Sequence, residues 1–186
     1  MKYLILGGTS YLGRHAVDAA RARGHEVTLF NRGRTNPGLF PDVEQLRGDR
    51  DSDLAPLAGR SWDAVLDPSG FRPRIVRTSG ERLRDAVGHY PFVSSINAYA
   101  DSTRPGLVET DALAELPEGA SREELTGDSY GPLKVLCERE AQRVFGERAA
   151  VVRAGLIFGP YDPTDRTGYW PVRVAEGGEV LAPGRP

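Results

Sequence analysis

Short apolar runs alternate along the chain with segments whose apolar residues recur at helical spacing. The runs are rich in apolar and β-branched residues and predict strands at 2–6, 26–30, 43–46, 63–67, 91–95 and 149–153. The periodic segments predict helices at 10–23, 72–87 and 130–145. Pro132 suits the first turn of the last helix. The alternation predicts an α/β fold with a doubly wound parallel sheet, a Rossmann-type arrangement of three layers.

Composition and charge exclude several classes of protein. The 24 basic and 26 acidic side chains give a net charge of −2, so we expect no basic face for nucleic acid or an anionic membrane. No apolar stretch approaches the ~20 residues of a membrane-spanning helix, and Gly7 comes too early for a signal peptide. The single cysteine, Cys137, can form neither an internal disulfide nor a cysteine zinc cluster. We expect a cytoplasmic protein without a metal site.

A glycine-rich turn, Gly7-Gly8-Thr9-Ser10-Tyr11-Leu12-Gly13, follows the first strand. Glycines let the backbone turn tightly and approach a pyrophosphate, which the N–H groups at a helix N-terminus stabilise. The spacing is G-x-x-S-x-x-G instead of G-x-G-x-x-G, and two glycines also occur in strand–helix turns that bind nothing. Its position in the first strand–helix unit favours a dinucleotide site.

The end of the second strand bears on the type of cofactor. An NAD site places a carboxylate there for the ribose 2′-hydroxyl, whereas an arginine accommodates the 2′-phosphate of NADP. This chain has Asn31-Arg32-Gly33-Arg34, which favours NADP over NAD. The alternative is that these are ordinary surface arginines of an arginine-rich chain. Asp49, with Arg50 beside it, follows the third strand and is placed to cap the adenine.

Tyr130 and Lys134 are four positions apart, so they share one face of the last predicted helix. A nearby ammonium lowers the pKa of a phenol from its usual value of about 10, which makes Tyr130 a candidate general acid and base. Lys134 is one of only two lysines. The alternative is a surface Tyr–Lys pair, but this helix follows a strand that ends in Ser94-Ser95.

Together these motifs resemble the short-chain dehydrogenase/reductase superfamily, in its extended, NAD-dependent epimerase/dehydratase-like branch. Ser10 in place of a glycine resembles an atypical subgroup that includes chloroplast RNA-binding relatives. The resemblance implies that Tyr130 moves the proton, Ser95 polarises the substrate oxygen and Lys134 holds the nicotinamide ribose. The candidate cofactor-binding residues are Gly7, Thr9, Ser10, Tyr11, Leu12, Gly13, Asn31, Arg32, Asp49, Arg50, Pro68, Ser69, Gly70, Ser94, Tyr130, Lys134, Ala154 and Leu156.

Two departures from the family pattern matter. Asp67-Pro68-Ser69-Gly70 stands where Asn-Asn-Ala-Gly is common, which alters the expected cofactor contacts. Ile96-Asn97 follows Ser95 where sugar-nucleotide dehydratases carry an Asp-Glu pair. We therefore discount dehydration, and epimerase or reductase chemistry remains.

The resemblance also implies a division of the chain. Residues 1–160 are predicted to form the NAD(P)-binding domain, and 161–186, with a helix over 169–175, the beginning of a substrate subdomain. Because the end of the chain, 182–186, shows no element that closes a substrate pocket, we expect a truncated form or a natural fragment that lacks activity by itself.

The expected activity is NAD(P)-dependent hydride transfer on a hydroxyl or carbonyl carbon of a sugar-nucleotide-like or other small substrate. The alternative is a non-catalytic relative that senses a nucleotide or binds RNA. The presence of Ser95, Tyr130 and Lys134 argues against a sensor, and the near-neutral charge argues against RNA binding. We expect a small-molecule substrate, no membrane or nucleic-acid partner, and leave a homodimer open.

Overall fold

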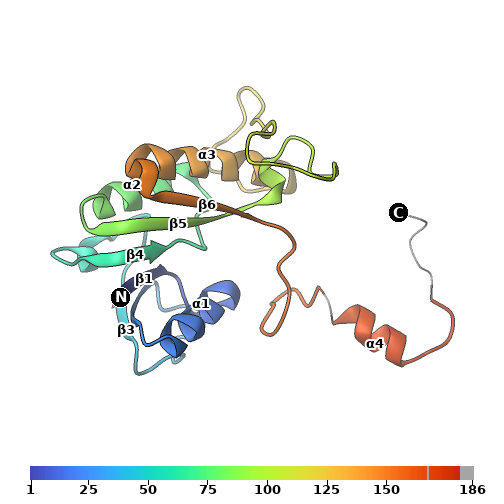
Figure 1. Ribbon diagram of the computed structural model, residues 1–186, viewed down its shortest axis with the longest axis horizontal. Coiled ribbons are helices and arrows are strands. Elements are labelled where there is room, and N and C mark those ends of the chain that lie inside the picture. The colour runs from blue at the N-terminus through green and yellow to red at the C-terminus, as the bar shows by residue number, and fades with distance from the viewer. Residues whose placement is uncertain (167, 181–186) are drawn as a thin grey trace. The chain divides into compact units, whose positions relative to one another are not determined.

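A six-stranded parallel sheet organises the first 155 residues (Figure 1). The computed structural model describes residues 1–166 and 168–180, which fall into two compact units, Met1–Gly155 and Leu156–Pro186. In the sheet the strands follow the order β3-β2-β1-β4-β5-β6, with every neighbouring pair parallel. The strands are β1 (Lys2–Leu6), β2 (Glu26–Asn31), β3 (Glu44–Arg47), β4 (Trp62–Leu66), β5 (Val87–Ser95) and β6 (Ala149–Ala154).

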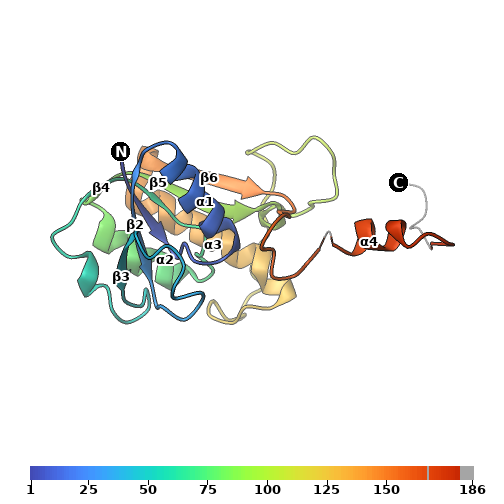
Figure 2. The ribbon, with the colours of Figure 1, turned by 90° about the horizontal axis from the view of Figure 1, so that it is seen from below.

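Alternate residues of the central strand face two separate apolar cores. Ile5 packs in one core with Val17 of α1 (Tyr11–Ala22). Leu4 and Leu6 pack in the other, with side chains of α2 (Pro73–Leu83) and α3 (Gly127–Phe145). Figures 1 and 2 show α1 on one face of the sheet and α2 and α3 on the other. The doubly wound, three-layer fold predicted from the sequence is confirmed.

The helix α3 begins three residues before its predicted start at Tyr130. Thr126 caps it: its hydroxyl accepts from the Ser129 N–H at 3.1 Å, while the Ser129 hydroxyl accepts from the Thr126 N–H at 2.8 Å. This reciprocal capping box satisfies two N–H groups that the helix leaves unpaired. Pro132 consequently lies in the second turn instead of the first, where the prediction was wrong.

The boundary between α2 and β5 also differs from the prediction. The helix ends at Leu83, not at Val87, because Val87 is the first residue of β5 and pairs with Trp62 of β4. The Trp62 N–H donates to the carbonyl of Ala86 at 2.8 Å, and this bond holds Ala86 next to β4, directly before β5 begins. β5 is therefore four residues longer at its start than the apolar run 91–95 suggested.

A short 3₁₀ helix, η2 (Ile96–Ala98), follows β5 and leads into the long predicted loop. Tyr99 and Leu113 form an antiparallel bridge across this loop. The helix α4 (Tyr169–Ala175), in the second unit, lies where the sequence predicts it. The expectation for 182–186 falls outside the described residues, and the division at residue 160 stays a prediction. Within the described part of the chain, no helix has the length and apolarity needed to cross a lipid bilayer.

Candidate functional site

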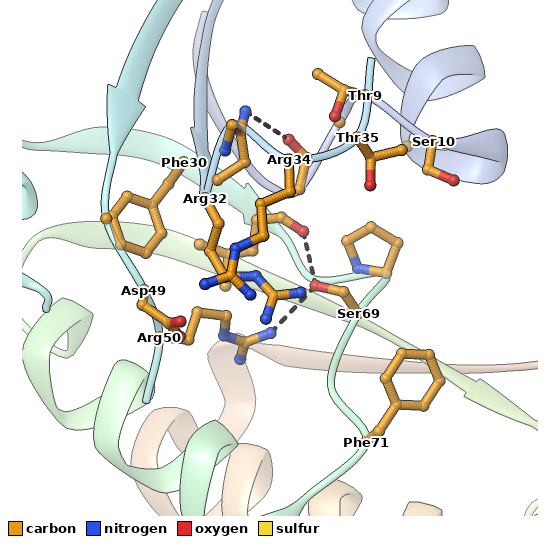
Figure 3. A pocket seen from close by; sticks show the side chains of 18 of the residues that line it. Thr9, Ser10, Phe30, Arg32, Arg34, Thr35, Asp49, Arg50, Ser69 and Phe71 are labelled. Carbon is orange, nitrogen blue, oxygen red and sulfur yellow. Dashed lines mark hydrogen bonds between the residues drawn. The ribbon is translucent and has the colours of Figure 1, made fainter. Parts of the chain in front are cut away.

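A cavity of about 500 Å³ opens where β1, β2 and β4 end, on both sides of the point at which the strand order reverses. Ligands of open α/β sheets bind at this switch point. The cavity brings together most of the predicted cofactor residues (Figure 3). Those that line it are Gly7, Thr9, Ser10, Tyr11, Leu12, Gly13, Asn31, Arg32, Asp49, Arg50, Pro68 and Ser69.

The glycines of the turn between β1 and α1 permit a close approach of backbone to backbone. A Cβ at Gly13 would stand 2.8 Å from the amide nitrogen of Gly8, and Gly8 itself has a φ of +90°. Only glycine fits both positions without a shift of the chain. Ser10 is the N-cap of α1, but its hydroxyl makes no capping hydrogen bond. The glycine-rich turn therefore lines the cavity, and the hydroxyl of Ser10 does not cap the N–H groups of the first turn of α1.

Arginines dominate the charge around the cavity. Arg32, Arg34, Arg50 and Arg72 line it, and Asp49 is the single acidic residue among the lining set. Figure 3 shows the side chains of Arg32 and Arg34 extending over the cavity. Guanidinium groups in such a group are suited to phosphate, because their planar N–H donors match its oxygens.

Asn31 ends β2 at the position where the sequence predicts the choice between NAD and NADP. Its side-chain oxygen accepts from the Gly33 N–H at 2.8 Å and from the Arg47 guanidinium. Its amide group donates to the carbonyl of Gly7 at 3.4 Å. The side chain therefore braces the two turns that border the cavity, and its oxygen is already engaged by two donors.

Arg50 lies at the floor of the cavity in a two-point ion pair with Asp67. The two guanidinium nitrogens each stand 2.7 Å from one carboxylate oxygen. Burial opposes the charge of both groups, but their mutual attraction and hydrogen bonds prevail, so the pKa of Asp67 is lowered and that of Arg50 is raised. Tyr90 donates to the same carboxylate at 2.7 Å, and burial together with Asp67 raises the pKa of Tyr90 well above its usual range.

The candidate catalytic residues Ser95, Tyr130 and Lys134 are not among the residues that line the cavity. The ring of Tyr130 is 6.4 Å from the ring of Phe71, which does line the cavity. The Ser95 hydroxyl accepts from the Asn97 N–H at 3.2 Å, at the start of η2. Since α3 packs directly on η2, the fold brings the segments of Tyr130 and Ser95 together. Their catalytic roles stay predictions.

Lys134 is buried beneath this region, with 2% of its surface exposed. Its ammonium donates to the carbonyl of Gly70 at 2.8 Å and to that of Val93 at 2.6 Å, and it lies 4.3 Å from the centre of the Phe92 ring. Burial lowers the pKa of Lys134. The lysine thus fastens α3 to the turn after β4 and to β5, a structural role that the sequence did not predict.

Four further candidates lie away from the cavity lining. Ser94 is buried, and its hydroxyl donates to the Glu138 carboxylate at the interface of β5 and α3, so its expected cofactor contact stays a prediction. Gly70 is buried against Phe92, where a Cβ would stand 2.4 Å from the ring. Ala154 ends β6, and Leu156 begins the second unit. The cofactor contacts of Gly70, Ala154 and Leu156 stay predictions.

The cavity also contains residues that were not among the candidates. Phe71 and Arg72 follow the turn after β4, and Ile75 lies in the first turn of α2. Their position directly after a strand's carboxyl end is the signal that could have identified them. The remaining additions are Leu6, Gly8, Phe30, Gly33, Arg34, Thr35 and Gly48.

Among curated proteins, the chain is similar to the chloroplast stem-loop binding protein of 41 kDa b from Arabidopsis thaliana. The two are 29% identical over 133 residues, which make up 60% of this chain and 34% of that relative. No family model matches the chain.

Solved structures of NAD-dependent epimerases share the fold. A UDP-galactose 4-epimerase is 22% identical with a TM-score of 0.66 and matches over 82% of this chain and 55% of its own. The UDP-glucuronic acid 4-epimerase from Bacillus cereus in complex with NAD is 18% identical with a TM-score of 0.62, over 87% and 58%. A short-chain dehydrogenase/reductase superfamily protein from Agrobacterium tumefaciens with bound NAD is 25% identical with a TM-score of 0.57, over 82% and 48%. This chain therefore spans about half the length of these structures.

Proposed function

We propose that this chain, which has the extended short-chain dehydrogenase/reductase fold of NAD-dependent epimerases, binds NADP(H). We propose further that it serves in hydride transfer on a small carbonyl or hydroxyl substrate. The observation that carries the proposal is the cavity at the switch point, where Arg32 and Arg34 follow a strand that ends without a carboxylate. Epimerisation or reduction of a sugar-nucleotide-like compound is the reaction class that we favour.

The residues present fit such a cofactor. Gly8 and Gly13 let the turn after β1 pack tightly, because a Cβ would collide with Leu29 at Gly8 and with the Gly8 backbone at Gly13. This turn and the first residues of α1 line the cavity, and backbone N–H groups at a helix N-terminus suit a pyrophosphate. Asn31 offers no free acceptor for a ribose 2′-hydroxyl, because Gly33 and Arg47 occupy its oxygen. Arginine side chains beside it favour an additional phosphate, which supports NADP over NAD.

The bound cofactor would supply the hydride chemistry. In the proposal the Tyr130 phenol exchanges a proton with the substrate oxygen, and the Ser95 hydroxyl donates a hydrogen bond to that oxygen. Both groups stand on rigid elements, α3 and the end of β5, that meet at η2. Phe71 lines the cavity, and its ring is the contact of Tyr130 with that lining.

A second candidate function is binding of structured RNA without catalysis. The similarity to the chloroplast stem-loop binding protein of Arabidopsis thaliana favours it. The net charge of −2 argues against it, because affinity for nucleic acid depends mainly on cations that contact phosphates. The first proposal includes a small-molecule substrate and a cytoplasmic location, and it leaves a homodimer open.

Calorimetry with NADPH and NADH tests the proposal. We expect the wild-type chain to bind NADPH about tenfold or more tightly than NADH, since each charge-assisted contact to a phosphate contributes about 1.5–3 kcal/mol. The double variant Arg32→Ser, Arg34→Ser should lose this preference, whereas Arg139→Ser, which removes an exposed arginine of α3, should keep it. Absence of heat with either cofactor at millimolar concentration would overturn the proposal, and steep salt-dependent retention of a stem-loop RNA on a filter would favour the second candidate.

A further inference from the structure

The ion pair of Arg50 and Asp67 is buried in the floor of the cavity and is joined to several other groups. The Asp67 side chain is fully buried. The Arg50 guanidinium also donates to the Ser79 hydroxyl of α2 at 2.8 Å. Tyr90 of β5 completes the surroundings of the carboxylate. The pair therefore links the chain just after β3 to β4, α2 and β5 beneath a single cavity.

The same carboxylate holds the turn that follows β4. One Asp67 oxygen accepts from the Ser69 N–H at 3.1 Å, and that oxygen is also bound by Arg50 at 2.7 Å. The Ser69 hydroxyl donates to the carbonyl of Leu6 at 2.8 Å and accepts from Arg50 at 3.4 Å (Figure 3). These bonds fix the turn against the end of β1, so the orientation of Pro68 and Ser69 in the cavity depends on the ion pair.

A purely structural purpose explains this arrangement poorly. Two charges lose their hydration on burial, and well-packed apolar side chains of similar volume often stabilise a fold equally well. Apolar side chains, however, cannot replace the Asp67 carboxylate, which accepts two hydrogen bonds from the Arg50 guanidinium and one from the Ser69 N–H. The buried pair lies in the floor of the cavity, where the conformation of the neighbouring loop affects ligand binding.

We propose that Arg50 and Asp67 are positioning residues that hold residues 67–70 in the shape that binds the cofactor, and that Arg50 does not itself contact the ligand. The inference rests on the proposed function, because it concerns the same site. It differs from the sequence-based expectation, which counts Arg50, beside Asp49, among the cofactor-binding residues. The Arg50 guanidinium hydrogen-bonds Asp67, Ser69 and Ser79.

The test compares cofactor affinity in variants that lose stability for different reasons. Arg50→Gln and Asp67→Asn break the pair, Arg50→Lys keeps the charge but not the two-point contact, and Leu83→Ala removes apolar contacts of α2 away from the cavity. Binding of NADPH is measured by its fluorescence at a temperature at which circular dichroism shows each variant to be folded. We expect Arg50→Gln and Asp67→Asn to weaken binding about tenfold or more, since small displacements of positioning groups have effects of this size. Arg50→Lys should recover part of the affinity, and Leu83→Ala should bind as the wild type does.

A double variant, Arg50→Met with Asp67→Leu, keeps the test decisive if the single variants unfold. It removes both buried charges together and avoids leaving one of them unpaired. We expect it to fold and to show the same loss of affinity. Wild-type affinity for NADPH in this variant, or equal losses of affinity in Arg50→Gln and Leu83→Ala, would overturn this inference but leave the proposed function intact. Failure of the wild-type chain to bind any cofactor would overturn the proposed function as well.

Discussion

Gly131 of α3 lies so close to Asn97 of η2 that a Cβ at Gly131 would stand 2.0 Å from the Asn97 carbonyl oxygen. Any larger residue at position 131 would push α3 away from η2. The contact sets the distance between the neighbours of these two residues, Tyr130 on α3 and Ser95 at the end of β5. The glycine next to the candidate proton donor thus allows α3 to approach the segment that follows Ser95.

Replacing this glycine tests the contact. Gly131→Ala should lower the free energy of unfolding by about 1–3 kcal/mol, because the added methyl group meets backbone that cannot move aside. Gly127→Ala is the matched control in the same helix, since nothing lies within 4 Å of a Cβ there. That substitution should be neutral or stabilising by up to about 1 kcal/mol. Urea denaturation measures both, and equal effects at the two positions would show that the close approach is unimportant.

The cap of α3 gives a second prediction. Thr126→Ala removes the hydroxyl that accepts from the Ser129 N–H and should destabilise the protein by about 1 kcal/mol. Thr126→Ser keeps the acceptor and should retain most of the stability. Thermal unfolding of the two variants compares them directly. A Thr126→Ser protein as unstable as Thr126→Ala would mean that the methyl group, and not the hydrogen bond, is responsible.

The buried carboxylate predicts how stability responds to acid. The pKa of Asp67 is lower in the folded protein than its usual value of about 3.9 in an unfolded chain. Its contribution to stability is therefore complete above the unfolded value and is lost as the pH falls through the folded value. Asp67→Asn should lower stability at neutral pH by roughly 3–5 kcal/mol, because Arg50 is left buried without its partner, and should flatten the decline in acid.

Urea midpoints measured across the acid range check this prediction, and Glu81→Gln is its control. Glu81 also has a lowered pKa, from its hydrogen bond with Arg143, but the pair is exposed to solvent. Exposed pairs contribute little, so the acid response of this variant should match that of the wild type. A curve for Asp67→Asn parallel to the wild-type curve would contradict the prediction.

Tyr130→Phe separates proton transfer from cofactor binding. It removes only the phenolic oxygen and leaves the ring beside Phe71. In a protein that turns over a carbonyl substrate, the rate should fall by about 10²- to 10⁴-fold while the affinity for NADPH stays the same. Stopped-flow oxidation of NADPH and a fluorescence titration measure the two quantities. Unchanged turnover would remove Tyr130 from the mechanism.

Local patterns were sufficient to predict the sheet. Most of the strands contain a short apolar run, and the alternation with helices implies parallel crossovers, so the three-layer fold follows from sequence order. β3 (Glu44–Arg47) is the exception, with Leu46 as its one apolar residue. Boundaries were harder to predict where a cap or a pairing partner decides them. Thr126 and Ser129 extend α3 beyond its apolar stripe, and pairing with Trp62 turns Val87 from the end of a helix into the start of a strand.

The site was predicted in part, for a physical reason. The turn after β1 and the arginines after β2 are local motifs, and the fold brings them to one cavity. The partners of Arg50 and Lys134 are distant in sequence: Asp67 is 17 positions from Arg50, and Gly70 is 64 positions from Lys134. No spacing rule connects such pairs. The sequence therefore predicted a ligand contact for both side chains, which stays a prediction, and could not predict their hydrogen bonds to the segment after β4.

The central place of β1 has a consequence for how the chain folds. Of the six strands of the sheet it comes first in the sequence, yet one of its two neighbours is β4, and the Lys2 N–H donates to the Asp63 side chain 61 positions later. Until residues 62–66 have left the ribosome, β1 can pair only with β2, and its other edge stays open. Parallel pairings between distant segments form slowly and leave apolar strands exposed meanwhile. The chain that follows β4 directly, at Pro68 and Ser69, lines the cavity, so the cavity can be completed only after the open edge of β1 has been paired.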